Sequence, residues 1–79
     1  MREYKLALIF AYMNILGKIT IVDCDYNTIF DRKLREDKKL TNFVMKHKYV
    51  PCELRRNPYD TECIDIILTQ RVYINEKEN

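Results

Sequence analysis

The sequence is poor in the residues typical of flexible or secreted chains. Its 79 residues include one glycine and two prolines, so it has little room for a flexible linker and cannot form a glycine-rich phosphate loop. The cysteines, Cys24, Cys52 and Cys63, are odd in number and include no Cys-x-x-Cys pair, which argues against a secreted disulfide framework. We therefore expect reduced thiols and a cytoplasmic protein.

An apolar run long enough to span a membrane is also lacking. The N-terminal run, residues 6–16, is interrupted by Asn14, whereas a spanning helix needs about 20 apolar residues. The charged residues before the run are similar to the start of a signal peptide, but no Ala-x-Ala-type cleavage site follows it. We assign this run to the protein core and expect no membrane contact.

What is present is the composition of a small globular protein. Hydrophobic residues make up 47% of the chain and charged residues 33%. We expect one compact domain over residues 1–79, with a polar tail that frays from about residue 75.

One segment has clear helical periodicity. Leu40, Phe43, Val44 and His47 recur at the spacing of one helix face. This spacing predicts a main helix over about residues 36–48.

Strand patterns occur on both sides of this helix. Residues 19–22 are β-branched and predict a strand, and residues 23–27 predict a turn because Asp and Asn bond to their own backbone. Residues 64–74 predict a long strand with one apolar face. Residues 49–61 contain both prolines and predict a loop.

Two segments are ambiguous. Residues 4–16 fit either a buried strand or a buried helix, and we favour the strand slightly. Residues 28–34 fit a second hairpin strand or the first turns of a helix. The predicted fold is α+β, a small mainly antiparallel sheet of three to four strands with one main helix packed on one face. We expect the last strand at a sheet edge, where it would pair with a second copy to form a homodimer.

Charge is distributed unevenly along the chain, whose formal net charge is +2. Residues 1–31 carry −1, residues 32–56 carry +6 and residues 57–79 carry −3. A basic block on the solvent side of a helix would attract phosphates or an acidic protein surface. The alternative, that these residues only solvate the helix, stays open, because the acidic pair Glu36-Asp37 stands beside the basic residues that follow.

We predict a partner-binding surface from this block and two tyrosines near it in the sequence, since tyrosine stacks on bases and anchors protein interfaces. The candidates are Arg32, Arg35, Lys38, Lys39, Lys46, Lys48, Tyr49, Arg55, Arg56 and Tyr59. A protein partner is the first hypothesis. A nucleic acid bound by the same face is the alternative, although no known nucleic-acid-binding motif accompanies the block.

Asp23 and Asp25 follow an apolar strand, and Thr28 and Ile29 come shortly after them. This stretch resembles the first motif of haloacid-dehalogenase-type phosphatases, which implies an aspartate nucleophile, a second aspartate as acid or base, and Mg²⁺. Thr28 falls one position late for that motif, and 79 residues cannot form the large doubly wound domain of those enzymes. We therefore interpret the stretch as a turn and predict that the protein is not an enzyme.

Zinc-binding residue types are present but poorly spaced. Cys24, His47, Cys52 and Cys63 lack the close cysteine pair that usually starts a zinc site, and His47 completes the apolar stripe of the predicted helix. We predict no metal and no cofactor.

Because the sequence contains no recognisable set of catalytic residues, we expect the protein to act by binding. We expect a small non-enzymatic binding or regulatory protein, with a nucleic-acid-binding regulator as the alternative. The residues that abound, Ile, Lys, Asn and Tyr, have A/T-rich codons. This usage adds the hypothesis of a viral or phage accessory factor that modulates a host protein through the basic helix face.

Overall fold

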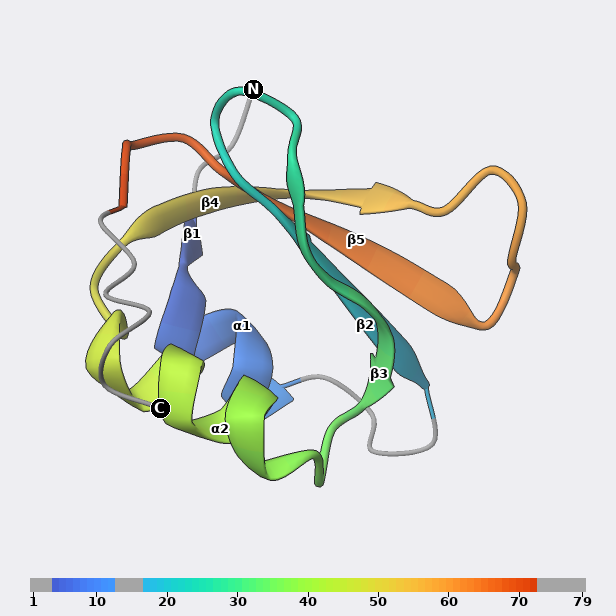
Figure 1. Cartoon of the computed structure of the whole chain (residues 1–79), viewed down its shortest axis with the longest axis horizontal. Coiled ribbons are helices and arrows are strands. Elements are labelled where there is room, and N and C mark those ends of the chain that lie inside the picture. Colours follow the sequence, from blue (N-terminus) through green and yellow to red (C-terminus); the bar gives the residue numbers. More distant parts are fainter. Residues whose placement is uncertain (1–3, 13–16, 73–79) are drawn as a thin grey trace.

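The computed structural model describes residues 4–12 and 17–72 (Figure 1). In chain order the elements are β1 (Tyr4–Lys5), α1 (Leu6–Tyr12), β2 (Lys18–Val22), β3 (Thr28–Leu34), α2 (Lys38–Lys46), β4 (Pro51–Arg56) and β5 (Cys63–Leu68). The strands form one sheet in the order β1-β4-β5-β2-β3. β2 and β5 run parallel, and the other neighbouring strands run antiparallel.

The α+β class is therefore confirmed, with differences in detail. The sheet has five strands instead of three to four, it is mixed, and two helices accompany it instead of one. Side chains from both helices meet the same face of β2 and β5 in one core. The core cluster consists of Leu6, Ile9, Ile19, Ile21, Leu40, Phe43, Val44, Cys52, Ile66 and Leu68. The opposite face of the sheet carries no helix within the described residues.

The N-terminal run forms a two-residue strand and then α1, so the preference for a strand is wrong over Leu6–Tyr12. Leu6 and Ile9 are buried while Leu8 between them is 50% exposed, which is a helical pattern. Leucine and alanine also have higher helix propensity than β-branched residues. Residues 13–16 of the run lie outside the described residues.

The middle of the chain follows the local patterns. The strand at residues 19–22 is confirmed as β2, and the turn after it is confirmed by a hydrogen bond from the Tyr26 N–H to the Asp23 carbonyl at 3.0 Å. Residues 28–34, ambiguous in sequence, form strand β3. The predicted helix is confirmed as α2, although it is shorter than residues 36–48.

Residues 49–61 were expected as a loop, and this is wrong because they contain β4. Pro51 is the first residue of the strand, a position where a sheet tolerates proline. Its carbonyl accepts a hydrogen bond from the Thr69 N–H at 3.0 Å. Pro51 begins the strand and Pro58 follows its end, so the prolines bracket β4 and do not interrupt it.

The last strand is shorter and more central than expected. β5 ends at Leu68 instead of continuing to residue 74, and it lies between β4 and β2. The edge position expected for this strand is therefore wrong, and a homodimer through a sheet edge stays a prediction. The near-continuous apolar run of β5 is typical of a central strand buried on both faces, which the alternation of its side chains does not indicate by itself. Residues 73–79, with the expected frayed tail, lie outside the described residues.

Within residues 4–12 and 17–72, neither helix has the length and apolar character needed to cross a bilayer.

Candidate functional site

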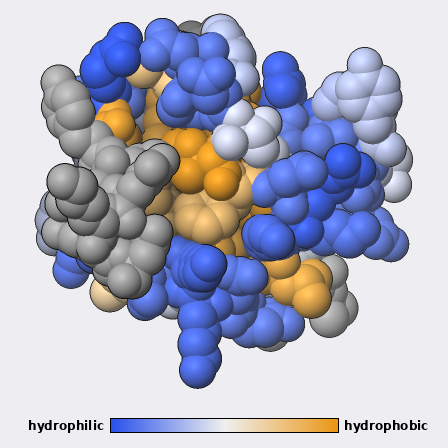
Figure 2. Space-filling view, viewed as in Figure 1, coloured by the Kyte–Doolittle hydropathy of each residue, from blue (hydrophilic) through white to orange (hydrophobic). Residues whose placement is uncertain are grey.

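Helix α2 carries lysines on the side away from the core. Asp37 caps the helix, because its carboxylate accepts a hydrogen bond from the Leu40 N–H at 3.0 Å. The apolar side of α2 packs on the sheet, which leaves Lys38, Lys39 and Lys46 exposed to solvent. In Figure 2, polar side chains predominate in the part of this region that the grey atoms leave uncovered.

Lys48 and Tyr49 extend this surface beyond the end of α2. The Lys48 ammonium lies 5.9 Å from the centroid of the Tyr49 ring, and Tyr49 is 75% exposed. We call Lys38, Lys39, Lys46 and Lys48 together the α2 lysine face. The structure thus brings together five of the ten predicted residues, counting Tyr49.

Three of the four lysines of this face lack a paired carboxylate among the described residues. In the described part of the chain, no carboxylate lies within ion-pair distance of Lys38, Lys39 or Lys48. Lys38 and Lys39 also occupy the first turn of α2, where the positive end of the helix dipole disfavours cations. These positive charges therefore do not stabilise the helix that carries them.

The other predicted residues lie elsewhere. The Arg35 guanidinium stands 4.9 Å from the centroid of the Phe10 ring in α1, so Arg35 contacts the other helix. Arg32 lies on β3, Arg55 and Arg56 lie on β4, and Tyr59 lies in the loop between β4 and β5. The predicted surface is therefore not one patch.

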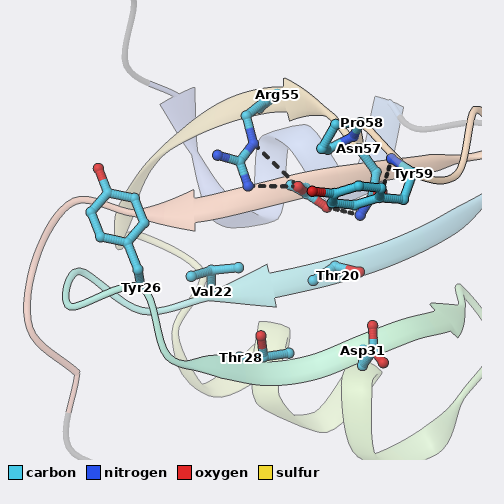
Figure 3. Close-up of a pocket in the computed structure, with 10 residues that line it drawn as sticks. Thr20, Val22, Tyr26, Thr28, Asp31, Arg55, Asn57, Pro58 and Tyr59 are labelled. Carbon is cyan, nitrogen blue, oxygen red and sulfur yellow. Dashed lines mark hydrogen bonds and ion pairs between the residues drawn. The ribbon is translucent and has the colours of Figure 1, made fainter.

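A second candidate site is a hollow of about 220 Å³ on the sheet face turned away from the helices, which we call the open face. Figure 3 shows this face with the helices behind the sheet. Thr20 and Val22 of β2 and Asp65 of β5 point into the hollow, because side chains alternate along a strand. Arg55 and Tyr59, two of the predicted residues, also line the hollow.

Asp65 is the buried charge of this hollow, with 2% of its surface exposed. Its Oδ2 accepts hydrogen bonds from Arg55 Nη2 at 2.9 Å and Nε at 3.2 Å, and its Oδ1 accepts one from Asn57 Nδ2 at 3.0 Å. Arg55 faces Asp65 directly across the β4–β5 pair. A buried carboxylate requires this compensation, so the three side chains act as one unit.

Thr20 connects β2 with both of its neighbours on the same face. Its Oγ1 accepts a hydrogen bond from the Arg32 N–H at 3.0 Å and lies 3.2 Å from the Cys63 Sγ. Arg32 has a φ of 49°, at an irregularity in the β2–β3 register. Burial raises the pKa of the Cys63 thiol, so the thiol stays protonated at neutral pH and is a poor nucleophile.

Two exposed tyrosines stand at the hollow on tight turns. Tyr26 is 71% exposed and has a φ of 64°, in a turn where the Asp23 Oδ1 accepts the Asn27 N–H at 2.8 Å. Tyr59 is 93% exposed, and its N–H donates to the Asn57 Oδ1 at 2.8 Å. Figure 3 places the two rings at opposite ends of the hollow. Tyrosines held in this way are typical anchors of binding surfaces.

The Asp-x-Asp stretch is used for this turn. The Asp23 carboxylate also accepts the Asp25 N–H at 2.9 Å, and the Asn27 N–H is the main cause of a lowered Asp23 pKa. Asp25 is paired with Arg71 at 3.3 Å. The interpretation of this stretch as a turn is confirmed.

The cysteines and the histidine are separated. Cys52 belongs to the core cluster on the helix side of the sheet, whereas the Cys63 thiol contacts Thr20 on the open face. Among the residues with described positions, no three His, Cys, Asp or Glu side chains are grouped so that they could hold a metal ion.

Sequence reasoning missed Thr20, Tyr26 and Asp65. Asp65 carried a signal, since an aspartate inside an apolar strand run indicates a buried charge that needs a cation. The sequence has no signal for Tyr26, because the left-handed residue of a turn is usually glycine or asparagine and a tyrosine is not expected there.

No family model, no curated protein and no solved structure matches the chain.

Proposed function

We propose that this protein is a non-enzymatic binding protein whose α2 lysine face, with Tyr49 beside it, docks on an acidic surface of a protein partner. One observation supports this. Lys38 and Lys39 have no carboxylate within ion-pair distance in the described part of the chain, and they lie in the helical turn least favourable to cations. Charges that oppose local stability are expected at functional sites, and here the missing counterpart is an external anion.

The size of the lysine face favours a protein partner over a nucleic acid. Lys38 and Lys46 lie about 12 Å apart along the helix axis at about 1.5 Å per residue. Proteins that bind duplex DNA through its backbone typically contact about 6–10 phosphates, whereas this face offers four ammonium groups. The exposed Tyr49 ring suits a protein interface, where tyrosines often carry much of the binding energy.

The regulatory part of the proposal is that the partner belongs to a host cell and that this chain is a viral or phage accessory factor. Its support is the abundance of Ile, Lys, Asn and Tyr, the amino acids whose codons are rich in A and T. The docking face itself is proposed independently of that origin.

The test compares three baits in nuclease-treated lysate: the wild type, K38E/K39E, and the matched control K33E/R56E. Both doubles change the net charge equally, and Lys33 and Arg56 are exposed on strands β3 and β4, outside the α2 lysine face. The captured protein is identified by mass spectrometry, purified and titrated by calorimetry. We expect an acidic partner whose Kd rises at least about tenfold with K38E/K39E and less than about twofold with K33E/R56E.

Two outcomes would contradict the proposal. Equal loss of binding in both doubles would show an effect of net charge without a docking face. Capture of the partner only when nuclease is omitted would support the nucleic-acid alternative. In that case a labelled duplex should bind, and the logarithm of its binding constant should fall with the logarithm of the salt concentration with a slope of about −3.6 if four phosphates are contacted.

A further inference from the structure

We propose that the hollow on the open face binds an arginine side chain of a polypeptide, independently of the α2 lysine face. The lining residues include two carboxylates: Asp65, which is buried and paired with Arg55, and Asp31, which is exposed and paired with Arg32 at 3.1 Å. They also include the rings of Tyr26 and Tyr59, whose faces attract cations. A donor-rich planar cation is the ligand that matches this lining.

The hydrogen-bonding groups of the hollow favour a donor over an acceptor. Arg55 Nε and Nη2 and Asn57 Nδ2 are directed to Asp65, so these donors are already engaged within the protein. Asp31 is different, because its carboxylate is 61% exposed and its pair with Arg32 lies at the surface. Exposed pairs of this kind are weak, so an incoming guanidinium can take the place of Arg32 at Asp31.

The two ends of the hollow differ in chemistry. In Figure 3, Asp31, Thr20 and Tyr59 lie toward one end, and Val22 and Tyr26 lie toward the other. A guanidinium at the first end would stack on the Tyr59 ring. Two of its N–H groups would donate hydrogen bonds to the Asp31 carboxylate. The adjoining peptide chain would then pass over Val22 toward Tyr26.

A titration of the ¹⁵N-labelled full chain, followed by ¹H–¹⁵N correlation spectra, tests this with two isosteric probes. N-acetyl-L-arginine methylamide carries the guanidinium, and N-acetyl-L-citrulline methylamide replaces it with a neutral urea. With the arginine probe, we expect the amide signals of Thr28, Asn57 and Tyr59 to shift and to saturate with a millimolar dissociation constant. The citrulline probe should shift none of them.

Three variants locate the site. Asp31→Asn and Tyr59→Ala should each raise the dissociation constant of the arginine probe about fivefold, the loss expected for one exposed charge or cation–π contact. Glu36→Gln removes an exposed carboxylate outside the hollow and should leave binding unchanged. Asp31 and Tyr59 are exposed, so both variants should fold, which the dispersion of the same spectra verifies. Equal shifts with citrulline, or wild-type affinity in Tyr59→Ala, would overturn the assignment.

Discussion

The open face and the α2 lysine face both carry several cations, but the cations are used differently. On or beside the open face, four cations lie against carboxylates: Lys18 with Asp60, Arg32 with Asp31, Arg55 with Asp65, and Arg71 with Asp25. On α2, Lys38 and Lys39 have no such neighbour among the described residues. Three of the four pairs connect separate strands or turns, and Arg32–Asp31 joins neighbours on β3, whereas Lys38 and Lys39 form no ion pair within the described chain.

This difference predicts opposite consequences of mutation. Removing a cation from the open face should leave a carboxylate uncompensated and weaken the fold. Removing Lys38 or Lys39 should leave the fold intact or strengthen it and should weaken only binding. The pairs are unequal, however, because Asp65 is buried whereas Asp31 and Asp25 are exposed. The Arg55–Asp65 pair should therefore show the largest effect.

The first prediction concerns Arg55→Met, which keeps the aliphatic stem and leaves the Asp65 carboxylate with Asn57 alone. We expect the free energy of unfolding to fall by about 2 kcal/mol, less than for a fully buried pair because Arg55 is 53% exposed. Urea unfolding followed by circular dichroism measures this. The neighbouring Arg56→Met is the control and should stay within about 0.5 kcal/mol of the wild type.

The double variant R55M/D65N sharpens this prediction. It removes the uncompensated charge, so it should recover most of the stability lost in Arg55→Met. If the double variant is as unstable as the single one, the loss does not come from an uncompensated Asp65 charge, and the open face does not differ from α2 in the way we describe.

The second prediction concerns the turn that presents Tyr26. A non-glycine residue in the left-handed region costs about 1 kcal/mol or more, and glycine does not pay this cost. Tyr26→Gly should therefore be about 1 kcal/mol more stable to urea than Tyr26→Ala. Equal stability of the two variants would show that the φ of 64° carries no strain and that the position of the tyrosine needs no functional explanation.

The two faces also differ in how far the sequence predicts them. The lysine face lies on α2 and the residues just after it, so helical periodicity around Leu40 and Phe43 was enough to place its members together. The Arg55–Asp65 pair depends on the register between β4 and β5, a contact between separate strands that no local pattern encodes. β4 itself was missed because Pro51 reads as a loop residue unless its place at the start of a strand is known.

The same reasoning applies to the fold. β2 and the turn after it follow from β-branched residues and from Asp and Asn, which act locally. The parallel pairing of β2 with β5 joins segments more than forty residues apart, such as Ile19 with Ile64, and only the assembled core selects it. α1 was misread because a run that is apolar at nearly every position has no periodicity to measure.

The third prediction is the stability of K38E/K39E, measured apart from its binding. Replacing two cations by anions in the first turn of α2 reverses an unfavourable interaction with the helix dipole. The free energy of unfolding should rise by about 0.5 kcal/mol, while partner binding falls. A loss of stability instead would mean that the two lysines contribute to the fold, and the contrast between the faces would fail.

The smallest expected effect is the pH dependence contributed by His47, at the end of α2. Burial lowers the pKa of His47 from its ordinary value of about 6.5, and the neighbouring Lys46 lowers it further. The imidazole packs against the Phe43 ring, with the two centroids 4.4 Å apart. Above about pH 6.5 the histidine is neutral in both states, so this contribution to stability is fully present.

As the pH falls below about 6.5, the unfolded chain binds the proton first, so the free energy of unfolding decreases until the folded state is protonated as well. The difference in stability between the wild type and His47→Gln should therefore shrink from about pH 7 to about pH 5. Lys46→Gln should reduce the slope of this decrease without abolishing it, because burial is the larger cause and the lysine the smaller. An unchanged slope in Lys46→Gln would show that the charge of Lys46 does not affect the pKa of His47. The Lys46 charge would then contribute nothing to this pH dependence, and burial alone would account for it.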